Sequence, residues 1–239
     1  MKATPLLLST ALIGLGVAMP MTFDLSDEML AKLKTGQSAG VLANTTTSAT
    51  GTTANEFLDG GCRPVIFFFA RGSTQDGNIG SDPGPQVIDD LKTAAGGDTV
   101  VAAQGLDYPA TLLANLLPQG CDPADATNFA ALITQGAAQC PTSQLVISGY
   151  SQGAALVHAA AKLLTASVAS KVSAAVTFGD TRKKQDGGVI PNIDASRGLI
   201  LCHDGDLVCD GTLLITDAHS DYDDLAPTAV SFITSKLTL

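Results

Sequence analysis

The sequence predicts an α/β fold: a three-layer α/β/α arrangement in which helices cover both faces of a small, mostly parallel, five-stranded sheet. From residue 62 onward, short apolar runs alternate with longer helical segments, which is typical of a parallel sheet between helices. The length of 239 residues suits one sizeable domain. Hydrophobic residues make up 45% and charged residues 15%, so the chain can build a core and does not belong to the disordered class.

Five apolar runs rich in β-branched or aromatic residues have the length of strands. They lie at residues 65–69, 99–103, 144–148, 174–178 and 198–202. Helical segments fit between and after these runs, at about residues 85–93, 122–139, 153–166 and 223–237. The last helix begins with acidic residues, which favour a helix N-terminus because they offset the positive end of the helix dipole.

The first 18 residues have the pattern of a secretory signal peptide. Lys2 precedes an apolar run from Leu6 to Val17, and the small residues Gly16 and Ala18 occupy the −3 and −1 positions of a cleavage site. The alternative is a membrane anchor, but this run is too short to cross a hydrocarbon core of about 30 Å. We therefore expect a secreted, extracellular protein without a transmembrane segment.

Residues 19–58 are predicted to form a propeptide or a flexible N-terminal extension, with the folded domain at residues 59–239. Within the extension, residues 24–33 have apolar side chains at helical spacing, whereas residues 43–55 are rich in Thr, Ser, Ala and Gly and have little to bury. Asn44 lies in an acceptor pattern for N-glycosylation. The alternative is an ordered lid, because the first half of this arm is amphipathic.

The charge balance argues against nucleic acid as a partner. The chain has 13 Lys and Arg residues against 23 Asp and Glu residues, a net charge of −10, and no basic run longer than residues 182–184. The three histidines are dispersed, and neither an H-E-x-x-H nor a C-x-x-C pattern occurs. We expect no metal, no nucleotide and no other cofactor.

The strongest local motif is Gly149-Tyr150-Ser151-Gln152-Gly153, a G-x-S-x-G pattern. A predicted strand ends just before it and an Ala-rich helical segment begins just after it, which is the context of a nucleophile elbow. The two glycines are needed because the tight turn brings neighbouring backbones together. Ser151 is therefore the candidate nucleophile; the alternative is a glycine-rich turn with an incidental serine.

Serine needs a general base, and the chain offers His158, His203 and His219. His158 lies seven residues beyond Ser151 on the same helix, about 10 Å along its axis, and is expected to be structural. The order nucleophile, acid, histidine that is typical of α/β-hydrolases favours His219. Among the acids between them we favour Asp206, with Asp204 and Asp180 as alternatives, because Asp206 lies between two cysteines that would hold it rigidly.

The chain has five cysteines, so at least one thiol is left over after pairing. Disulfides are expected because the predicted secretory route is oxidising. Spacing favours Cys202 and Cys209 as one pair.

Several motifs together resemble the cutinase family of secreted fungal serine esterases, over about residues 62–235. The matching segments, in chain order, are Ala70-Arg71-Gly72-Ser73-Thr74, Gly77-Asn78-Ile79-Gly80, Gly84-Pro85, Tyr108-Pro109-Ala110-Thr111, residues 149–153, Gly205-Asp206-Leu207-Val208-Cys209, and His219 with Tyr222.

The resemblance implies a role for each matching residue. Ser151 would be the nucleophile, Asp206 the acid and His219 the base, with Ser73 and the Gln152 backbone N–H forming the oxyanion hole. It also implies two disulfides, Cys62–Cys140 and Cys202–Cys209. Cys121 would then be unpaired, either as a buried inert thiol or as part of an interchain bridge.

Two departures from the family pattern are visible. Gln75 stands where the family often has Glu, which removes a charge beside the oxyanion loop. The surroundings of His219, residues 216–221, are more acidic than the apolar flank expected from the family, and nearby carboxylates tend to raise the pKa of an imidazole.

The predicted function is a secreted serine esterase that hydrolyses cutin-type aliphatic polyesters and short-to-medium-chain acyl esters through an acyl-enzyme. Two apolar stretches are candidates for the rim that contacts the acyl chain, and their alternative is ordinary core; the candidate binding residues are Leu116, Leu117, Leu213 and Leu214. Alternatives are an acetyl or carbohydrate esterase, a short-chain lipase and, outside enzymes, a catalytically silent protein that binds lipid surfaces. We expect a monomer.

Overall fold

The structure is a computed structural model, and it describes residues 49–239. The predicted signal peptide, the helical pattern at residues 24–33 and the sequon at Asn44 lie outside the described residues.

The centre of the fold is a five-stranded sheet in the order β2-β1-β3-β4-β5, with every neighbouring pair parallel. Its strands are β1 (Val65–Ala70), β2 (Val101–Gly105), β3 (Gln144–Tyr150), β4 (Val172–Phe178) and β5 (Gly198–Leu201). All five predicted strands are present, and the sheet is parallel throughout. The strand that carries the candidate nucleophile, β3, is the middle one.

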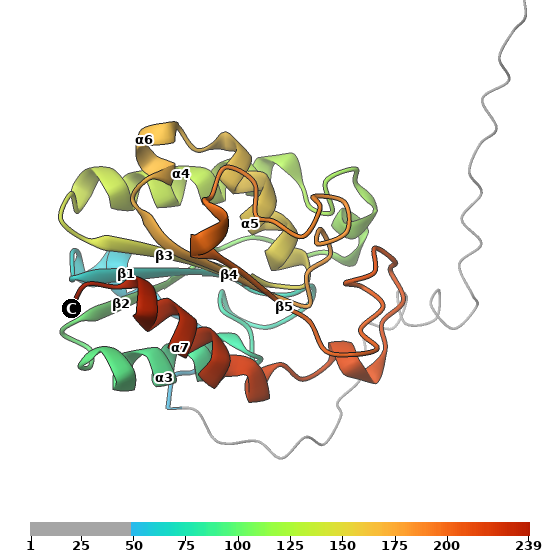
Figure 1. Cartoon of the computed structure of the whole chain (residues 1–239), viewed down its shortest axis with the longest axis horizontal. Coiled ribbons are helices and arrows are strands. Elements are labelled where there is room, and N and C mark those ends of the chain that lie inside the picture. The colour runs from blue at the N-terminus through green and yellow to red at the C-terminus, as the bar shows by residue number, and fades with distance from the viewer. Residues whose placement is uncertain (1–48) are drawn as a thin grey trace, which may run out of the picture. The chain divides into compact units, whose positions relative to one another are not determined.

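Helices cover both faces of this sheet, which confirms the three-layer prediction (Figure 1). One face carries α3 (Gly84–Ala95) and α7 (Ala226–Lys236), and the other carries α4 (Pro123–Gln139), α5 (Gln152–Leu163) and the short α6 (Ala166–Ala169). The side chains of β1 alternate between the two cores. Ile66 and Phe68 pack with α4 and α5, whereas Phe67 and Phe69 pack with α3 and α7.

Short elements complete the chain. They are α2 (Glu56–Gly60) and the 3-10 turns η1 (Leu112–Leu116), η2 (Ala195–Arg197), η3 (Asp217–His219) and η4 (Asp223–Leu225). The last predicted helix, residues 223–237, is therefore one 3-10 turn followed by α7. Pro227 lies in the first turn of α7, where its missing N–H costs no helical bond.

Residues 54–58, at the end of the predicted extension, pack on the domain. The backbone of Ala54 bonds to Asn78 and Gly105, and Asn55 pairs with Gln104 as an isolated bridge. Phe57 is buried, with its ring edge-on to Phe68 at 5.7 Å between centroids. The Thr-rich composition of the preceding stretch gives no indication of these contacts.

Candidate active site

Ser151 stands on a strained turn between β3 and α5. Its φ of 55° lies in the left-handed region that L-residues rarely adopt, as expected of a nucleophile elbow. A Cβ on Gly149 would overlap the carbonyl of Gly153, and a Cβ on Gly153 would overlap the carbonyl of Ala70. Both flanking glycines are therefore required by close backbone approach.

The loops after the strands bring two further residues to this serine. The Ser151 Oγ lies 2.9 Å from Nε2 of His219, and Nδ1 of His219 lies 2.8 Å from Oδ2 of Asp206. All three residues are buried, and Ser151 retains 8% of its surface exposed. A neutral imidazole with its proton on Nδ1 satisfies both bonds, because the ring donates to the carboxylate and accepts from the hydroxyl.

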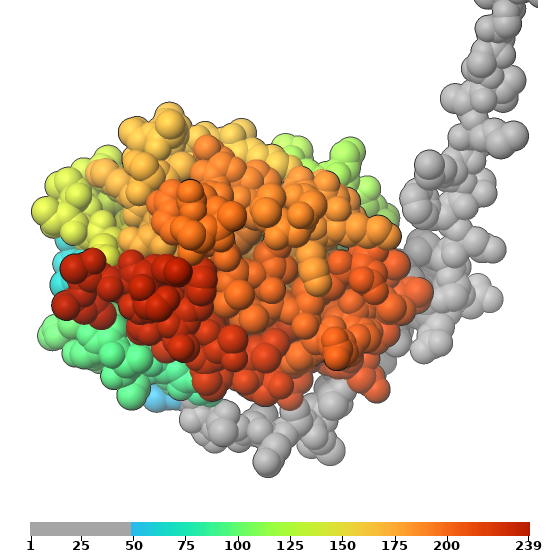
Figure 2. All heavy atoms as spheres, in the orientation of Figure 1, coloured from blue at the N-terminus to red at the C-terminus, as the bar shows by residue number. Residues whose placement is uncertain are grey.

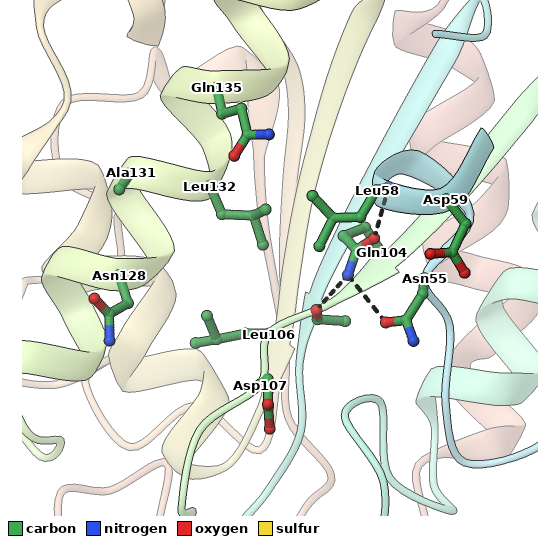
Figure 3. Close-up of a pocket in the computed structure, with 11 residues that line it drawn as sticks. Asn55, Leu58, Asp59, Gln104, Leu106, Asp107, Asn128, Ala131, Leu132 and Gln135 are labelled. Carbon is green, nitrogen blue, oxygen red and sulfur yellow. Dashed lines mark hydrogen bonds between the residues drawn. The ribbon is translucent and has the colours of Figure 1, made fainter. Parts of the chain in front are cut away.

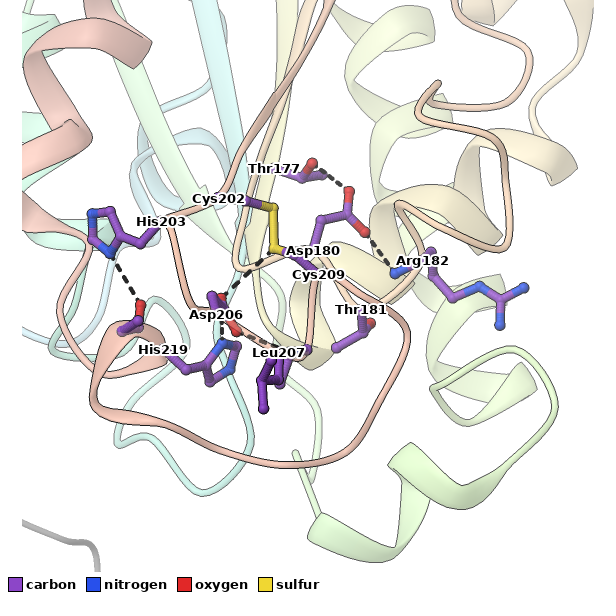
Figure 4. Close-up of a disulfide and its surroundings, with 12 residues drawn as sticks. Thr177, Asp180, Thr181, Arg182, Cys202, His203, Asp206, Leu207, Cys209 and His219 are labelled. Atoms are coloured by element: carbon purple, nitrogen blue, oxygen red, sulfur yellow. Dashed lines mark hydrogen bonds and ion pairs between the residues drawn. A yellow bond between two sulfur atoms is a disulfide. The ribbon is translucent and has the colours of Figure 1, made fainter.

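Asp206 is held by more than the histidine (Figure 4). Its Oδ1 accepts from the Val208 N–H at 3.0 Å, and its Oδ2 accepts from the Tyr222 hydroxyl at 2.6 Å. Burial raises the pKa of Asp206, but the hydrogen bonds from His219 and Tyr222 outweigh burial and hold the pKa below its ordinary value. The carboxylate is thus ionised and fixed in place, as an orienting acid must be.

The alternative acids and bases lie elsewhere. Asp180 is buried but bonds to His158, at 2.9 Å between Oδ2 and Nε2, and Asp204 is exposed. His158 also bonds to Asp186, so a carboxylate lies at each of its ring nitrogens. His203 bonds to the Ala218 carbonyl and to Asp224.

Two tyrosines pack around His219. The ring of Tyr150 stacks on that of His219 at 5.3 Å, and its hydroxyl donates to the His219 carbonyl. Tyr222 accepts a bond from the backbone N–H of His203 while it donates to Asp206. These supporting contacts were not predicted from the sequence. Tyr150 occupies the variable position of the G-x-S-x-G motif, so the motif does not predict it. Tyr222 contacts Asp206 from 16 residues away, and only the family resemblance pointed to it.

The two residues expected to form an oxyanion hole both bond to the segment around η1. The Ser73 Oγ accepts from the Asn115 side chain at 2.8 Å. The fully buried side chain of Gln152 donates to the Thr111 carbonyl at 2.8 Å. Gln152 is the first residue of α5, where a backbone N–H has no intrahelical acceptor. Asn115 was not identified from the sequence, since its spacing carries no motif.

The apolar stretches predicted as a rim are largely exposed rather than core. Leu116 and Leu214 are 51% and 58% exposed, and Leu117 and Leu213 are also exposed. The first stretch is tied to Ser73 through Asn115, and the second lies between Cys209 and His219 in the chain. Figure 2 shows the loops that follow β5, orange to red, at the surface.

A separate surface cavity of about 480 Å³ lies between α2, the end of β2 and α4 (Figure 3). Leu58, Leu106 and Leu132 form its apolar part, and the amides of Asn128 and Gln135 lie at its edge. It contains none of the residues around Ser151, so the candidate active site is defined by hydrogen-bonded geometry and lies outside this cavity.

Both implied disulfides are present. Cys62–Cys140 links chain positions 78 residues apart, and Cys202–Cys209 closes the loop that holds Asp206 (Figure 4). Cys121 is a buried free thiol, and burial raises its pKa to about 12, so the inert alternative fits the structure better than an interchain bridge.

An acidic cluster beside Tyr222 is the one group of potential metal ligands among residues 49–239. Carboxylate oxygens of Asp82, Asp221 and Asp223 lie within 4.8 Å of one another. Burial, reinforced by Asp223 and Asp221, raises the pKa of Asp82 to about 8, although a bond from the Tyr222 N–H lowers it. Asp82 Oδ2 and Asp223 Oδ1 are buried without a hydrogen-bond partner, which a proton shared between the two carboxyls would supply.

In the described part of the chain, no helix combines the length and the apolar character needed to cross a membrane.

Comparisons with known proteins agree with this geometry. The cutinase family model matches residues 61–237. Cutinase CUT2 of Pyricularia oryzae is 53% identical over 192 residues, which cover 80% of this chain and 89% of that protein. A cutinase of Botryotinia fuckeliana is 42% identical over 172 residues, covering 72% and 82%.

Solved structures show the same relationship. A Trichoderma reesei cutinase in complex with a phosphonate inhibitor matches with a TM-score of 0.71 and 36% identity, over 79% of this chain and 81% of that one. The catalytic core domain of acetyl xylan esterase from Trichoderma reesei matches with a TM-score of 0.60 and 26% identity, over 74% and 100%. The family match over most of the chain shows that this protein belongs to the cutinase family and is a carboxylic ester hydrolase.

Proposed function

We propose that Ser151 is the nucleophile of this esterase, His219 its general base and Asp206 the acid that orients the base. The observation that carries the proposal is the continuous series of bonds at 2.9 Å and 2.8 Å that starts at a strained serine. Ser151 Oγ attacks the ester carbonyl carbon while its proton passes to Nε2 of His219. Asp206 stabilises the imidazolium that forms.

The tetrahedral intermediate carries its negative charge on the former carbonyl oxygen. We assign Ser73 and the Gln152 N–H as its donors, and each such donor is worth about 3 kcal/mol. When the ester C–O bond breaks, the alcohol leaves with the proton from His219, and Ser151 keeps the acyl group. Water then attacks the acyl carbon, His219 takes its proton, and Ser151 is regenerated as the acid is released.

The substrate proposed is an aliphatic polyester of the cutin type, or a short-to-medium-chain acyl ester. The support is the exposed apolar surface of two segments linked to the site. Leu116 and Leu117 follow Asn115, which bonds to Ser73, and Leu213 and Leu214 precede His219 in the chain. Exposed leucines of this kind can hold an aliphatic chain while the ester bond lies at Ser151.

Hydrolysis of p-nitrophenyl esters from acetate to palmitate tests both the mechanism and the substrate class. We expect the highest kcat/KM for short-to-medium chains and a loss of at least about 10⁴-fold in Ser151→Ala. Retained activity in Ser151→Ala would contradict the mechanism. Absence of Ser151 labelling by an organophosphonate in the intact protein would favour a silent lipid-binding protein instead.

Acetyl-ester hydrolysis is the second candidate, favoured by the similarity to an acetyl xylan esterase core at 26% identity. The same triad serves both reactions, so only the acyl preference separates them. Activity confined to the acetate ester, unchanged in Leu214→Ser, would support this candidate. A loss on longer esters alone in that variant would support the polyester assignment.

Secretion is proposed from the two disulfides and the predicted signal peptide. N-terminal sequencing of the protein from culture medium tests it, because cleavage after Ala18 would leave Met19 as the first residue. The mass in solution, measured by light scattering, tests the expected monomer.

A further inference from the structure

We propose that Gln75 is a positioning residue that holds the oxyanion loop, residues 71–75, in its active shape. The proposal rests on the assignment of Ser73 as an oxyanion donor. It adds a residue that touches neither substrate nor triad but determines where Ser73 lies.

The Gln75 amide uses its two ends in opposite ways. Its Oε1 accepts from the backbone N–H of Gly72 at 2.8 Å, and its Nε2 donates to the carbonyl of Asp82 at 2.7 Å. A neutral amide does both at once at any pH, whereas an ionised carboxylate accepts but cannot donate. The Gly72 N–H is thereby occupied within the protein, which leaves Ser73 as the donor of this loop.

The fold provides a fitted space for this amide. A Cβ on Gly80 would overlap the Gln75 side chain, and a Cβ on Gly72 would lie 3.3 Å from Oε1 and 2.7 Å from the Tyr150 ring. Two glycines therefore leave room for one side-chain amide, and neighbouring atoms enclose it. Such enclosure fixes the rotamer of Gln75, as a positioning group requires.

Further hydrogen bonds anchor the rest of the loop, one of them at Gln75 itself. Arg71 Nε donates to the Gln75 carbonyl at 2.7 Å, and the Thr74 N–H donates to the Ala110 carbonyl at 2.8 Å. Ser73 lies between these anchors, and its Oγ is bonded by Asn115. Release of the Gln75 side chain would free the Gly72 end of the loop, and a displacement of about 1 Å at an oxyanion donor costs up to about 100-fold in rate.

Gln75 also joins the two halves of the catalytic site. Gln75 donates to the backbone carbonyl of Asp82, and the Asp82 side chain accepts from the Tyr222 N–H at 3.0 Å. The Tyr222 hydroxyl in turn donates to Asp206. The oxyanion loop is thus connected to the acid of the triad through backbone and side-chain bonds, by way of Gln75 and Asp82.

Gln75→Met and Gln75→Glu separate positioning from simple packing. Methionine keeps the length of the side chain and loses both hydrogen bonds, so kcat should fall about 10- to 100-fold while KM stays within about twofold. The fall in kcat should be the same at every pH. Glutamate keeps the acceptor and donates to the Asp82 carbonyl only when protonated. The ratio of its kcat to that of the wild type should therefore rise at least about fivefold as the pH falls from 8.5 to 5.5.

Gln135→Met, on an exposed face of α4, is the matched control and should leave kcat unchanged. Thermal unfolding and circular dichroism establish that each variant is folded under assay conditions. A ratio for Gln75→Glu that does not change with pH, or a kcat equal to the wild type in Gln75→Met, overturns the proposal. Ser73→Ala, assayed in parallel, tests the oxyanion assignment itself: a loss there without a loss in the Gln75 variants refutes only the positioning role.

Discussion

Two buried histidines bond through both ring nitrogens, and the difference between their partners separates catalysis from support. His219 lies between the Ser151 hydroxyl and the Asp206 carboxylate. His158 lies between two carboxylates, with Nε2 at 2.9 Å from Asp180 and Nδ1 at 2.8 Å from Asp186. Both residues are at most 3% exposed, so solvent access does not distinguish them.

A hydroxyl can donate or accept, whereas an ionised carboxylate only accepts. His219 can therefore be neutral and take a proton from Ser151. His158 must donate from both nitrogens, because hydrogen bonds from His158, Thr177 and the Arg182 N–H outweigh burial and hold the pKa of Asp180 below its ordinary value. With a carboxylate at each ring nitrogen, His158 has no free lone pair with which to act as a base.

The largest expected effect comes from breaking the catalytic member of this comparison. His219→Gln should lower kcat/KM by about 10⁴- to 10⁶-fold, because Ser151 loses its proton acceptor. The melting temperature should change by only a few degrees. Ester hydrolysis and thermal unfolding measured on the same preparation test this, and a variant that keeps a tenth of the wild-type rate would refute the role of His219.

The carboxylates that face the two histidines form a second matched pair. Asp206→Asn should lower kcat by about 10⁴-fold, because an amide at this position favours the wrong imidazole tautomer. Asp180→Asn removes an equally buried carboxylate, yet kcat should stay within about tenfold. A comparable loss of kcat in both variants would mean that the choice of Asp206 over Asp180 is wrong.

His158→Gln should reverse the pattern seen for His219. Removal of the imidazole leaves Asp180 buried without its main partner, so the free energy of unfolding should fall by about 3–5 kcal/mol. The kcat of the folded enzyme should change by less than about tenfold, because His158 bonds to no catalytic residue. Denaturant unfolding gives the stability, and an unchanged midpoint would show that the cluster does not support the fold.

The same cluster should determine the acid limit of stability. Burial raises the pKa of Asp186 as it does that of Asp180, but bonds from Lys162 and His158 outweigh burial and lower it. Because both folded pKa values lie below 3.8, their stabilisation is present above that pH and is lost as the pH falls through the folded values.

Wild-type stability should therefore fall steeply with decreasing pH below about 4, and His158→Gln should show a shallower slope there. Urea unfolding from pH 5 to pH 2.5 measures both slopes. Identical slopes would mean that His158 does not contribute to the depressed pKa values.

The sequence predicted the sheet, the elbow and the triad because their signals are local or follow chain order. The run of residues 65–69 is apolar on both faces, and Ser151 lies between a strand and a helix, so each could be recognised alone. What it missed are loop contacts between distant positions. Asn115 reaches Ser73 across 42 residues and Tyr222 reaches Asp82 across 140, and no periodicity marks such pairs.

Asp82 and Asp223 show what two carboxyls do when no imidazole stands between them. Burial raises the pKa of Asp82 to about 8 and also raises that of Asp223. A raised pKa changes stability with pH in the opposite direction to the lowered pKa of Asp180. Its stabilisation is complete below the ordinary value of 3.8 and is lost as the pH rises through about 8.

Asp82→Asn should therefore be as stable as the wild type near pH 4 and more stable above pH 8, by a few degrees in melting temperature. An amide can donate to Asp223 Oδ1 without a proton from solvent, and it keeps the acceptor for the Tyr222 N–H. Thermal unfolding at pH 4 and pH 9 measures the difference. A gain of equal size at both pH values would show that the pair of Asp82 and Asp223 carries no shared proton.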